Sequence, residues 1–288
     1  MVEDASARRY GRVFDQVAAE YDRNRPRYPE ELIAEACECA TIERGDPILE
    51  IGCGSGQLTS SLLARGFRVV VVEPGEQLIS LAAQNLGGSG AVEFVNARFE
   101  DAPVPAGQFR AVFSASAFHW IDPDISWEKV ARVLVPGGTL ALIQYCGLAE
   151  ERSIDDQREL LSALARIAPE VAADWPTYRE LEAIMAGAEQ RRENVSEMWS
   201  WIGSHDLVRD AASRLFSDVH VAVVPALMEH TAGELTALFR TASPYHRLSP
   251  QQRQAIERGH VEMYQRLGRP VRSSVVAVLV TARRTIEA

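Results

Sequence analysis

Short apolar runs alternate with longer amphipathic stretches along the first half of the chain. Short runs of mostly β-branched residues predict buried strands, whereas apolar residues recurring every three or four positions predict helices. The predicted strands cover 47–51, 68–73, 91–95, 110–115 and 139–145. The predicted helices that follow them cover 57–65, 76–86 and 124–134. Strands alternating with helices in this way predict a parallel, doubly wound α/β sheet.

The pattern changes on both sides of this core. Ahead of it, helical spacing over 8–22 and 30–40 is interrupted by the stretch Arg25-Pro-Arg-Tyr-Pro29. Behind it, helical patterns near 153–167, 177–190 and 196–216 contain no strand, and another helical stretch, 231–267, separates the expected strands 220–224 and 274–282. The expected division is a lid and cofactor-binding core (1–146), a helical cap insertion (147–217), and the remainder of the core with a second helical insertion (218–288).

The segment 47–56 reads Pro-Ile-Leu-Glu-Ile-Gly-Cys-Gly-Ser-Gly. A buried strand that runs into Gly52, Gly54 and Gly56 predicts a sharp turn, because glycine tolerates positive φ and lets a ligand lie against the backbone. The next helix is expected to begin near Gln57, so that its free N–H groups face the loop. The turn therefore predicts a nucleotide-like ligand.

The spacing of the loop narrows the class of ligand. The dinucleotide fingerprint is G-x-G-x-x-G, whereas this loop is the tighter G-x-G-x-G, and the absence of G-K-[ST] excludes a P-loop. Glu50 stands just before the glycines. Glu73 ends the second strand at about the 20-residue offset from which an acid reaches a ribose hydroxyl. A ribose-binding acid suits both NAD and S-adenosyl-L-methionine (SAM), so Glu73 does not separate them.

The spacing E-x-G-x-G-x-G resembles the first motif of class I SAM-dependent methyltransferases. The strand ending in Glu73, the segment Ser116–Asp122 and the Pro136-Gly-Gly138 turn follow in the order typical of that family. The resemblance is to methyltransferase type 11-like proteins, in particular the trans-aconitate methyltransferase-like small-molecule group. It implies a Rossmann-like seven-stranded sheet with strand 7 antiparallel, N-terminal lid helices and helical cap insertions.

The resemblance also implies the cofactor contacts. Glu50 would face the methionine ammonium, and Tyr21 and Arg25, in a stretch that resembles a lid, would close over the methionine end. Relatives often place an acid where Arg98 stands; arginine accepts no hydrogen bond, so adenine would be held by the backbone there with Phe99 against a ring face. The expected cofactor-binding residues are Tyr21, Arg25, Glu50, Gly52, Cys53, Gly54, Gly56, Glu73, Pro74, Arg98, Phe99, Ser116 and Trp120.

Methyl transfer from SAM is an SN2 displacement, and holding the nucleophile in line provides much of the rate. A general base is needed only when the acceptor must lose a proton. Ser116-Ala-Phe-His-Trp120 follows the fourth strand and matches the trans-aconitate-like group, so His119 is the candidate base or substrate-orienting group. A structural histidine with satisfied hydrogen bonds is the alternative.

The acceptor site has the weakest signal. The expected acceptor-binding residues are Tyr28, His119, Tyr145, Trp199, Tyr245 and His246. Tyr245 and His246 belong to a polar, aromatic loop that either reaches an acidic acceptor or simply connects helices. Trp199 either lines an apolar pocket or packs in the core, the commoner fate of an aromatic stripe.

Composition limits the remaining classes of function. The net charge of −10 and the pI near 5.2 argue against nucleic-acid binding. The polar N-terminus and the lack of an apolar run near 18 residues predict a cytoplasmic protein without a membrane segment. The four cysteines lack zinc spacing, so no metal is expected. We expect a monomer or homodimer.

The sequence thus predicts SAM-dependent methylation of a small molecule, an acidic metabolite or natural product, with O-methylation slightly favoured. Two alternatives also use SAM: a non-methylating reaction such as cyclisation, and a non-catalytic SAM-binding protein. A third, an NAD-dependent oxidoreductase, is disfavoured by the glycine spacing.

Overall fold

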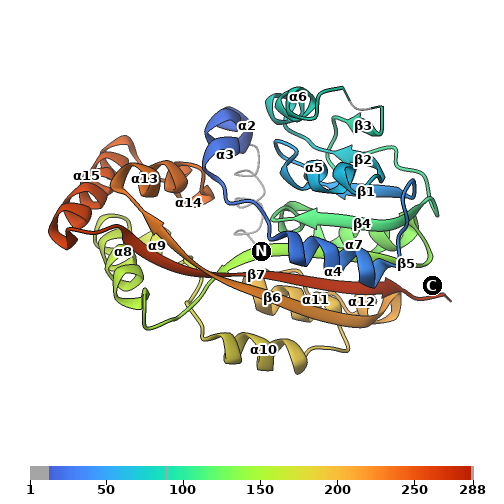
Figure 1. The fold of residues 1–288 in the computed structure, drawn as a ribbon. Coiled ribbons are helices and arrows are strands. Elements are labelled where there is room, and N and C mark those ends of the chain that lie inside the picture. Colours follow the sequence, from blue (N-terminus) through green and yellow to red (C-terminus); the bar gives the residue numbers. More distant parts are fainter. Residues whose placement is uncertain (1–12, 89, 287–288) are drawn as a thin grey trace.

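One mixed sheet of seven strands organises the molecule (Figure 1). The structure is a computed structural model that describes residues 13–88 and 90–286. The strands are β1 (Pro47–Ile51), β2 (Arg68–Val72), β3 (Val92–Val95), β4 (Phe109–Ala115), β5 (Leu134–Gly147), β6 (Phe216–His230) and β7 (Val271–Arg284). Their order is β3-β2-β1-β4-β5-β7-β6, with β1 to β5 parallel and β7 antiparallel to both neighbours. The predicted fold is confirmed.

Alternate side chains of the strands pack against helices on opposite faces of the sheet. Ile48 belongs to a buried cluster with the helices α4 (Glu30–Ala40), α5 (Gln57–Ala64) and α6 (Glu76–Asn85). Leu49 belongs to the other, with the helices α7 (Pro123–Val133), α10 (Leu181–Glu189), α11 (Val195–Gly203) and α12 (Ala211–Leu215). We call the sheet with these helices the core. Its apolar runs thus form strands that are buried on both sides, as expected for parallel sheets.

The last two strands are longer than the sequence pattern predicts. β7 pairs with β5 only as far as the pair Gly147 and Val275, whereas β6 and β7 continue to pair up to His230 and Val271. A two-stranded ribbon therefore projects past the carboxyl end of β5. Helices pack around it in Figure 1, and we call them and the ribbon the distal lobe. They are α8 (Ile154–Ile167), α9 (Pro169–Ala172), α13 (Ala232–Arg240), α14 (Ser243–His246) and α15 (Pro250–Leu267).

Several predicted helices are divided in the structure. The stretch 231–267 forms α13, α14 and α15, because Pro244 and Pro250 each occupy the first turn of a new helix. The stretch 196–216 breaks at Ser204, which adopts a left-handed conformation at φ 56°. The predicted N-terminal helix is seen as α2 (Val13–Gln16) and α3 (Ala18–Asn24), and its earlier residues lie outside the described part of the chain.

Candidate functional site

The glycine loop after β1 depends on three left-handed residues. Gly52, Gly54 and Gly56 have φ values of 73°, 54° and 88°. A Cβ on Gly52 would lie 2.3 Å from the Cβ of Ala117, so the chain after β4 leaves no room for a side chain there. Gly56 is the N-cap residue of α5. The loop thus presents bare backbone at the carboxyl edge of the sheet, where open α/β sheets bind ligands.

Two buried carboxylates flank this loop. Glu73 accepts hydrogen bonds from the backbone N–H of Gly54 at 3.0 Å and of Gly75 at 2.9 Å. Glu50 accepts one from the Thr59 hydroxyl at 2.7 Å. Burial raises the pKa of Glu50 to about 7 and also raises the pKa of Glu73. A cationic group beside either acid would stabilise its ionised form.

The N-terminal helices cover the loop and are fixed to the core. Asp15 Oδ1 accepts hydrogen bonds from the backbone N–H of Gln77 at 2.7 Å and of Leu78 at 3.0 Å, in the first turn of α6. On the other side, Gln57 Nε2 in α5 donates to the carbonyl of Asp22 at 3.2 Å. These contacts join α2 and α3 to the helices that follow β2 and β1. They form a lid over the edge of the sheet.

Arg25 follows the lid helix and keeps one donor free. Its guanidinium lies 5.2 Å from the centre of the Tyr21 ring, and one of its NH2 groups donates to the Thr241 carbonyl at 2.6 Å. Its Nε is buried without a hydrogen-bond partner in the described part of the chain. A buried, unpaired donor is costly, so Arg25 is suited to an anionic group of a ligand.

The segment after β4 brings two histidines together. Ser116 has a φ of 52°, a strained value for a residue other than glycine, and it redirects the chain into the short helix Phe118–Trp120. The His119 ring stacks on the His205 ring, with centroids 4.2 Å apart and an angle of 11°. Burial, His205 and Arg25 hold the pKa of His119 well below its usual value. His119 is therefore neutral, and its Nδ1 is buried without a partner among the described residues.

A cavity of about 600 Å³ runs from this edge into the distal lobe. Tyr21, Arg25 and Ser116 line one end of it. Tyr28 and Tyr145, whose rings stack with centroids 5.8 Å apart, line it further on. Burial raises the pKa of Tyr145 to about 12, so its hydroxyl is neutral, and this hydroxyl donates to the Arg27 carbonyl at 2.6 Å.

The adenine region differs from the contacts expected there. Phe99 is buried in the core, and Lys129 Nζ lies 5.0 Å from its ring centre. One face of the ring is therefore already covered. Arg98 pairs with Glu100 at 2.6 Å. Pro74 lies between Glu73 and Gly75, and the Cys53 side chain is buried.

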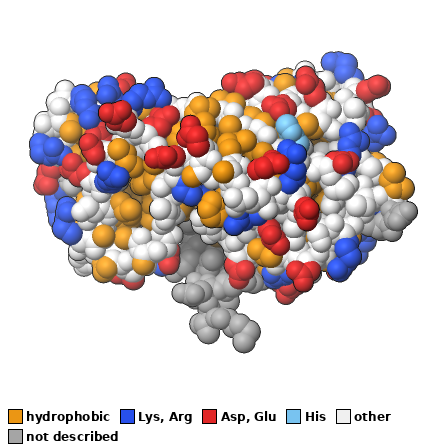
Figure 2. All heavy atoms as spheres, turned by 90° about the horizontal axis from the view of Figure 1, so that it is seen from below, with side chains coloured by type: hydrophobic (Ala, Val, Ile, Leu, Met, Phe, Trp, Pro, Cys, Tyr) orange, Lys and Arg blue, Asp and Glu red, His pale blue; other side chains and the backbone are white. Residues whose placement is uncertain are grey.

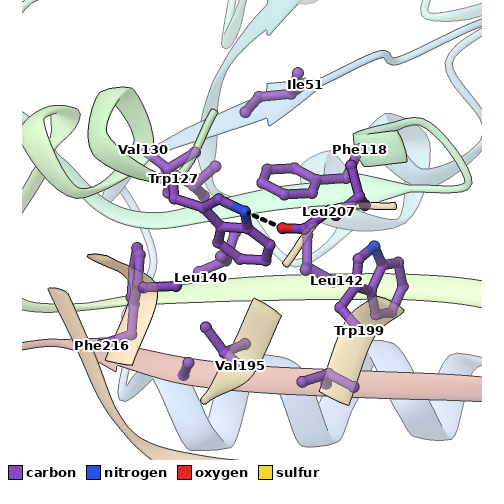
Figure 3. Packing of buried hydrophobic residues seen from close by; sticks show 14 of the residues in the cluster. Ile51, Phe118, Trp127, Val130, Leu140, Leu142, Val195, Trp199, Leu207 and Phe216 are labelled. Atoms are coloured by element: carbon purple, nitrogen blue, oxygen red, sulfur yellow. Dashed lines mark hydrogen bonds between the residues drawn. The ribbon is translucent and has the colours of Figure 1, made fainter. Parts of the chain in front are cut away.

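Several residues expected to bind the acceptor do not line the cavity. Trp199 is fully buried in the core, because the apolar face of α11 packs on the sheet (Figure 3). The Tyr245 hydroxyl donates to Glu257 at 2.9 Å, and His246 is also in α14. Trp199, Tyr245 and His246 are therefore not part of the lining of this cavity. His119 itself does not line the cavity. It lies three positions after Ser116, which does line it.

Sequence reasoning missed two kinds of contact. Phe14 packs edge-on against Tyr21 and Trp120, with ring centroids 5.6 and 5.7 Å away. It lies in the stretch that resembles a lid, so the sequence did carry a signal for this contact. Asp15 lies in the same stretch. His205 had no signal, because only the folded cap brings it to His119.

Comparison with known proteins agrees with this geometry. A family model described as a methyltransferase domain matches residues 49–142, which span β1 to β5. Over residues 49–142 the chain is therefore similar to methyltransferase domains. Domains of this family take SAM as methyl donor, and the glycine loop, the acids and the free Nε of Arg25 fit that molecule.

The relatives cover only part of the chain. An uncharacterized methyltransferase of Mycobacterium tuberculosis is 35% identical over 130 residues, 45% of this chain and 51% of the relative. The ubiquinone/menaquinone biosynthesis C-methyltransferase UbiE of Escherichia coli is 30% identical over 152 residues, 50% of this chain and 61% of the relative. The chain thus spans about half to three fifths of the length of these curated relatives.

Solved structures extend the likeness of fold beyond the domain. The YcgJ protein of Bacillus subtilis has a TM-score of 0.52 at 16% identity, covering 89% of this chain and 99% of its own. The [4+2]-cyclase SpnF has a TM-score of 0.51 at 15% identity, covering 97% and 96%. At such identities the likeness shows the fold alone. Within residues 13–88 and 90–286, no helix is both long and apolar enough to cross a membrane.

Proposed function

We propose that this chain transfers the methyl group of SAM to a small-molecule acceptor. The observation that supports this most is the free Nε of Arg25, which lies beside the Tyr21 ring at the cofactor end of the cavity. Arg25 would pair with the methionine carboxylate and Glu73 with the ribose. Bare backbone at Gly52 and Gly54 would let the cofactor approach closely.

The acceptor would enter the cavity that begins at the same edge. SAM supplies an electrophilic methyl group, so the task of the protein is to hold the acceptor atom in line and to exclude water. His119 is the candidate substrate-orienting group, because it lies three positions after Ser116, which lines the cavity, and because the burial that lowers its pKa makes it a weak general base. We propose oxygen as the acceptor atom on the resemblance to the trans-aconitate methyltransferase-like group.

An acidic acceptor has less support than the sequence indicated. Arg247 pairs with Asp174 at 2.6 Å, and Tyr245 and His246 do not line the cavity. Arg25 is the cation at the cavity's cofactor end, and the proposal assigns it to SAM. No second cationic group is left for the acceptor among the described lining residues at that end.

Two measurements test this function on the full chain. Calorimetric titration should show binding of SAM and S-adenosylhomocysteine but not NAD; binding of NAD alone would contradict the proposal. Incubation with methyl-deuterated SAM and a small-molecule extract should give a labelled product and S-adenosylhomocysteine. Turnover without S-adenosylhomocysteine would indicate a non-methylating reaction, and binding without turnover a non-catalytic protein.

A further inference from the structure

The distal half of the cavity points to the class of acceptor. We propose that the acceptor is an amphiphile: its reactive head lies near Ser116 and His119, and its elongated apolar tail lies in the distal lobe. This inference rests on the proposed methyl transfer for the role of the head. The assignment of the apolar tail rests on the cavity alone.

The walls of the distal part are apolar and come from several elements. Leu164 of α8, Leu238 and Phe239 of α13, and Ile256 and Met263 of α15 line it. Figure 2 shows hydrophobic side chains on the distal lobe beside the hollow between the two halves of the molecule. Methionine is flexible and fills irregular space, so a wall containing it adapts to tails of different shape.

Two histidines inside this part each have one ring nitrogen paired within the protein. His230 Nε2 lies 3.2 Å from the Ser273 hydroxyl, and His260 Nδ1 lies 3.0 Å from the Thr236 hydroxyl. Burial lowers the pKa of His260 to about 4 and also lowers the pKa of His230, so both rings are neutral. A bound tail therefore meets no charge on these residues, and apolar contact is the favourable interaction left.

The charged groups of the distal lining lie at its rim. Arg266 forms an ion pair with Glu159, and Arg166 donates to the Ser162 hydroxyl at 3.1 Å. Arg166 of α8 and Arg266 and Glu262 of α15 are all exposed. An amphiphile inserted head-first would thus pass a polar rim and bury its tail behind it.

A homologous series of 4-alkylphenols, from ethyl to nonyl, tests the assignment. Calorimetry on the full chain, with and without S-adenosylhomocysteine, gives one dissociation constant for each member. Each added methylene should tighten binding about threefold to fourfold until the cavity is filled. Affinity that does not depend on chain length, or no binding by any member, would overturn the proposal.

A matched pair of glycine variants locates the tail. Gly259 in α15 lines the cavity, and a Cβ there would meet nothing within 4 Å, so the first carbon of the side chain in Gly259→Leu displaces no neighbour. Gly233 in α13 is also free of neighbours within 4 Å but is exposed and does not line the cavity, so Gly233→Leu is the control. Gly259→Leu should weaken the nonyl member at least tenfold and leave the ethyl member unchanged. Equal effects of the two variants would overturn the proposal.

The binding of S-adenosylhomocysteine separates this inference from the proposed function. Both glycine variants should bind it like the unmodified chain, because neither position belongs to the glycine loop or the lid. Loss of chain-length dependence with intact S-adenosylhomocysteine binding contradicts only the apolar tail. Chain-length dependence without S-adenosylhomocysteine binding contradicts the methyl transfer and leaves the apolar site standing.

Discussion

The core and the distal lobe share the antiparallel strand pair β6–β7 but use it differently. In the core, Val278 and Leu279 of β7 are fully buried, one in each of the two large clusters that cover opposite faces of the sheet. In the distal lobe, Met228 and Ser273 of the same strand pair line a cavity, and the buried clusters there are small. A close-packed region thus holds the glycine loop in place, and a hollow one provides the space that we assign to the acceptor.

The lid joins the two regions. Arg25 follows α3, and its guanidinium donates to the Thr241 carbonyl at the end of α13. The residue that we assign to the cofactor is therefore positioned by the distal lobe. This contact gives the acceptor region a physical route by which to affect cofactor binding.

The largest effect on cofactor binding is expected at the glycine loop. Gly52→Ala combines a left-handed φ of 73° with a contact of 2.3 Å to Ala117. The backbone conformation costs about 1–2 kcal/mol and the overpacking about 1–3 kcal/mol of unfolding free energy. S-adenosylhomocysteine binding should fall below detection. Gly45→Ala is the control, because Gly45 has a φ of 88° and a Cβ there would meet nothing within 4 Å. In denaturant unfolding it should lose only the part of the unfolding free energy that comes from the backbone conformation.

Truncating one leucine in each region compares their packing directly. Leu142 is fully buried in the core, so Leu142→Ala should lower the unfolding free energy by about 3–5 kcal/mol. Leu238 is half-buried and already faces the cavity, so Leu238→Ala should cost about 1 kcal/mol or less. Urea unfolding measures both. Equal losses would show that the distal lobe is packed as tightly as the core.

The division between the regions could be predicted only in part. The strands from 47 to 145 and the glycine loop were predictable, because they depend on local apolar runs and on residues that tolerate positive φ. The distal lobe was not, because the lengths of β6 and β7 depend on pairing between segments far apart in sequence. The pattern around Trp199 suits both a core helix and a pocket wall, and only the tertiary structure separates them.

Removing the guanidinium of Arg25 should weaken cofactor binding without unfolding the core. Arg25→Ala should reduce the affinity for S-adenosylhomocysteine about tenfold, a loss of about 1.4 kcal/mol in binding free energy. Arg23→Ala, at an exposed position in α3, should leave the affinity unchanged. Titration calorimetry checks both, and an unchanged affinity in Arg25→Ala would remove this residue from the site.

Cofactor affinity should depend on pH through Glu50. Because its raised pKa is about 7, Glu50 holds a proton in much of the ligand-free protein below neutral pH. The cationic groups of SAM favour the ionised form, so binding releases that proton, and affinity rises with pH up to about 7, by at most about tenfold per unit, and levels off above it. Glu50→Gln should flatten the part of this profile centred near pH 7. An unchanged profile would assign the dependence to another group.

Hydrogen exchange with each ligand tests the central claim, that the cofactor and the acceptor tail occupy different regions. S-adenosylhomocysteine should slow exchange in the glycine loop, from Gly52 to Gln57, and in the lid. 4-Nonylphenol should slow exchange in α8, α13 and α15 and leave the glycine loop unchanged. Protection of the same segments by both ligands would contradict the account.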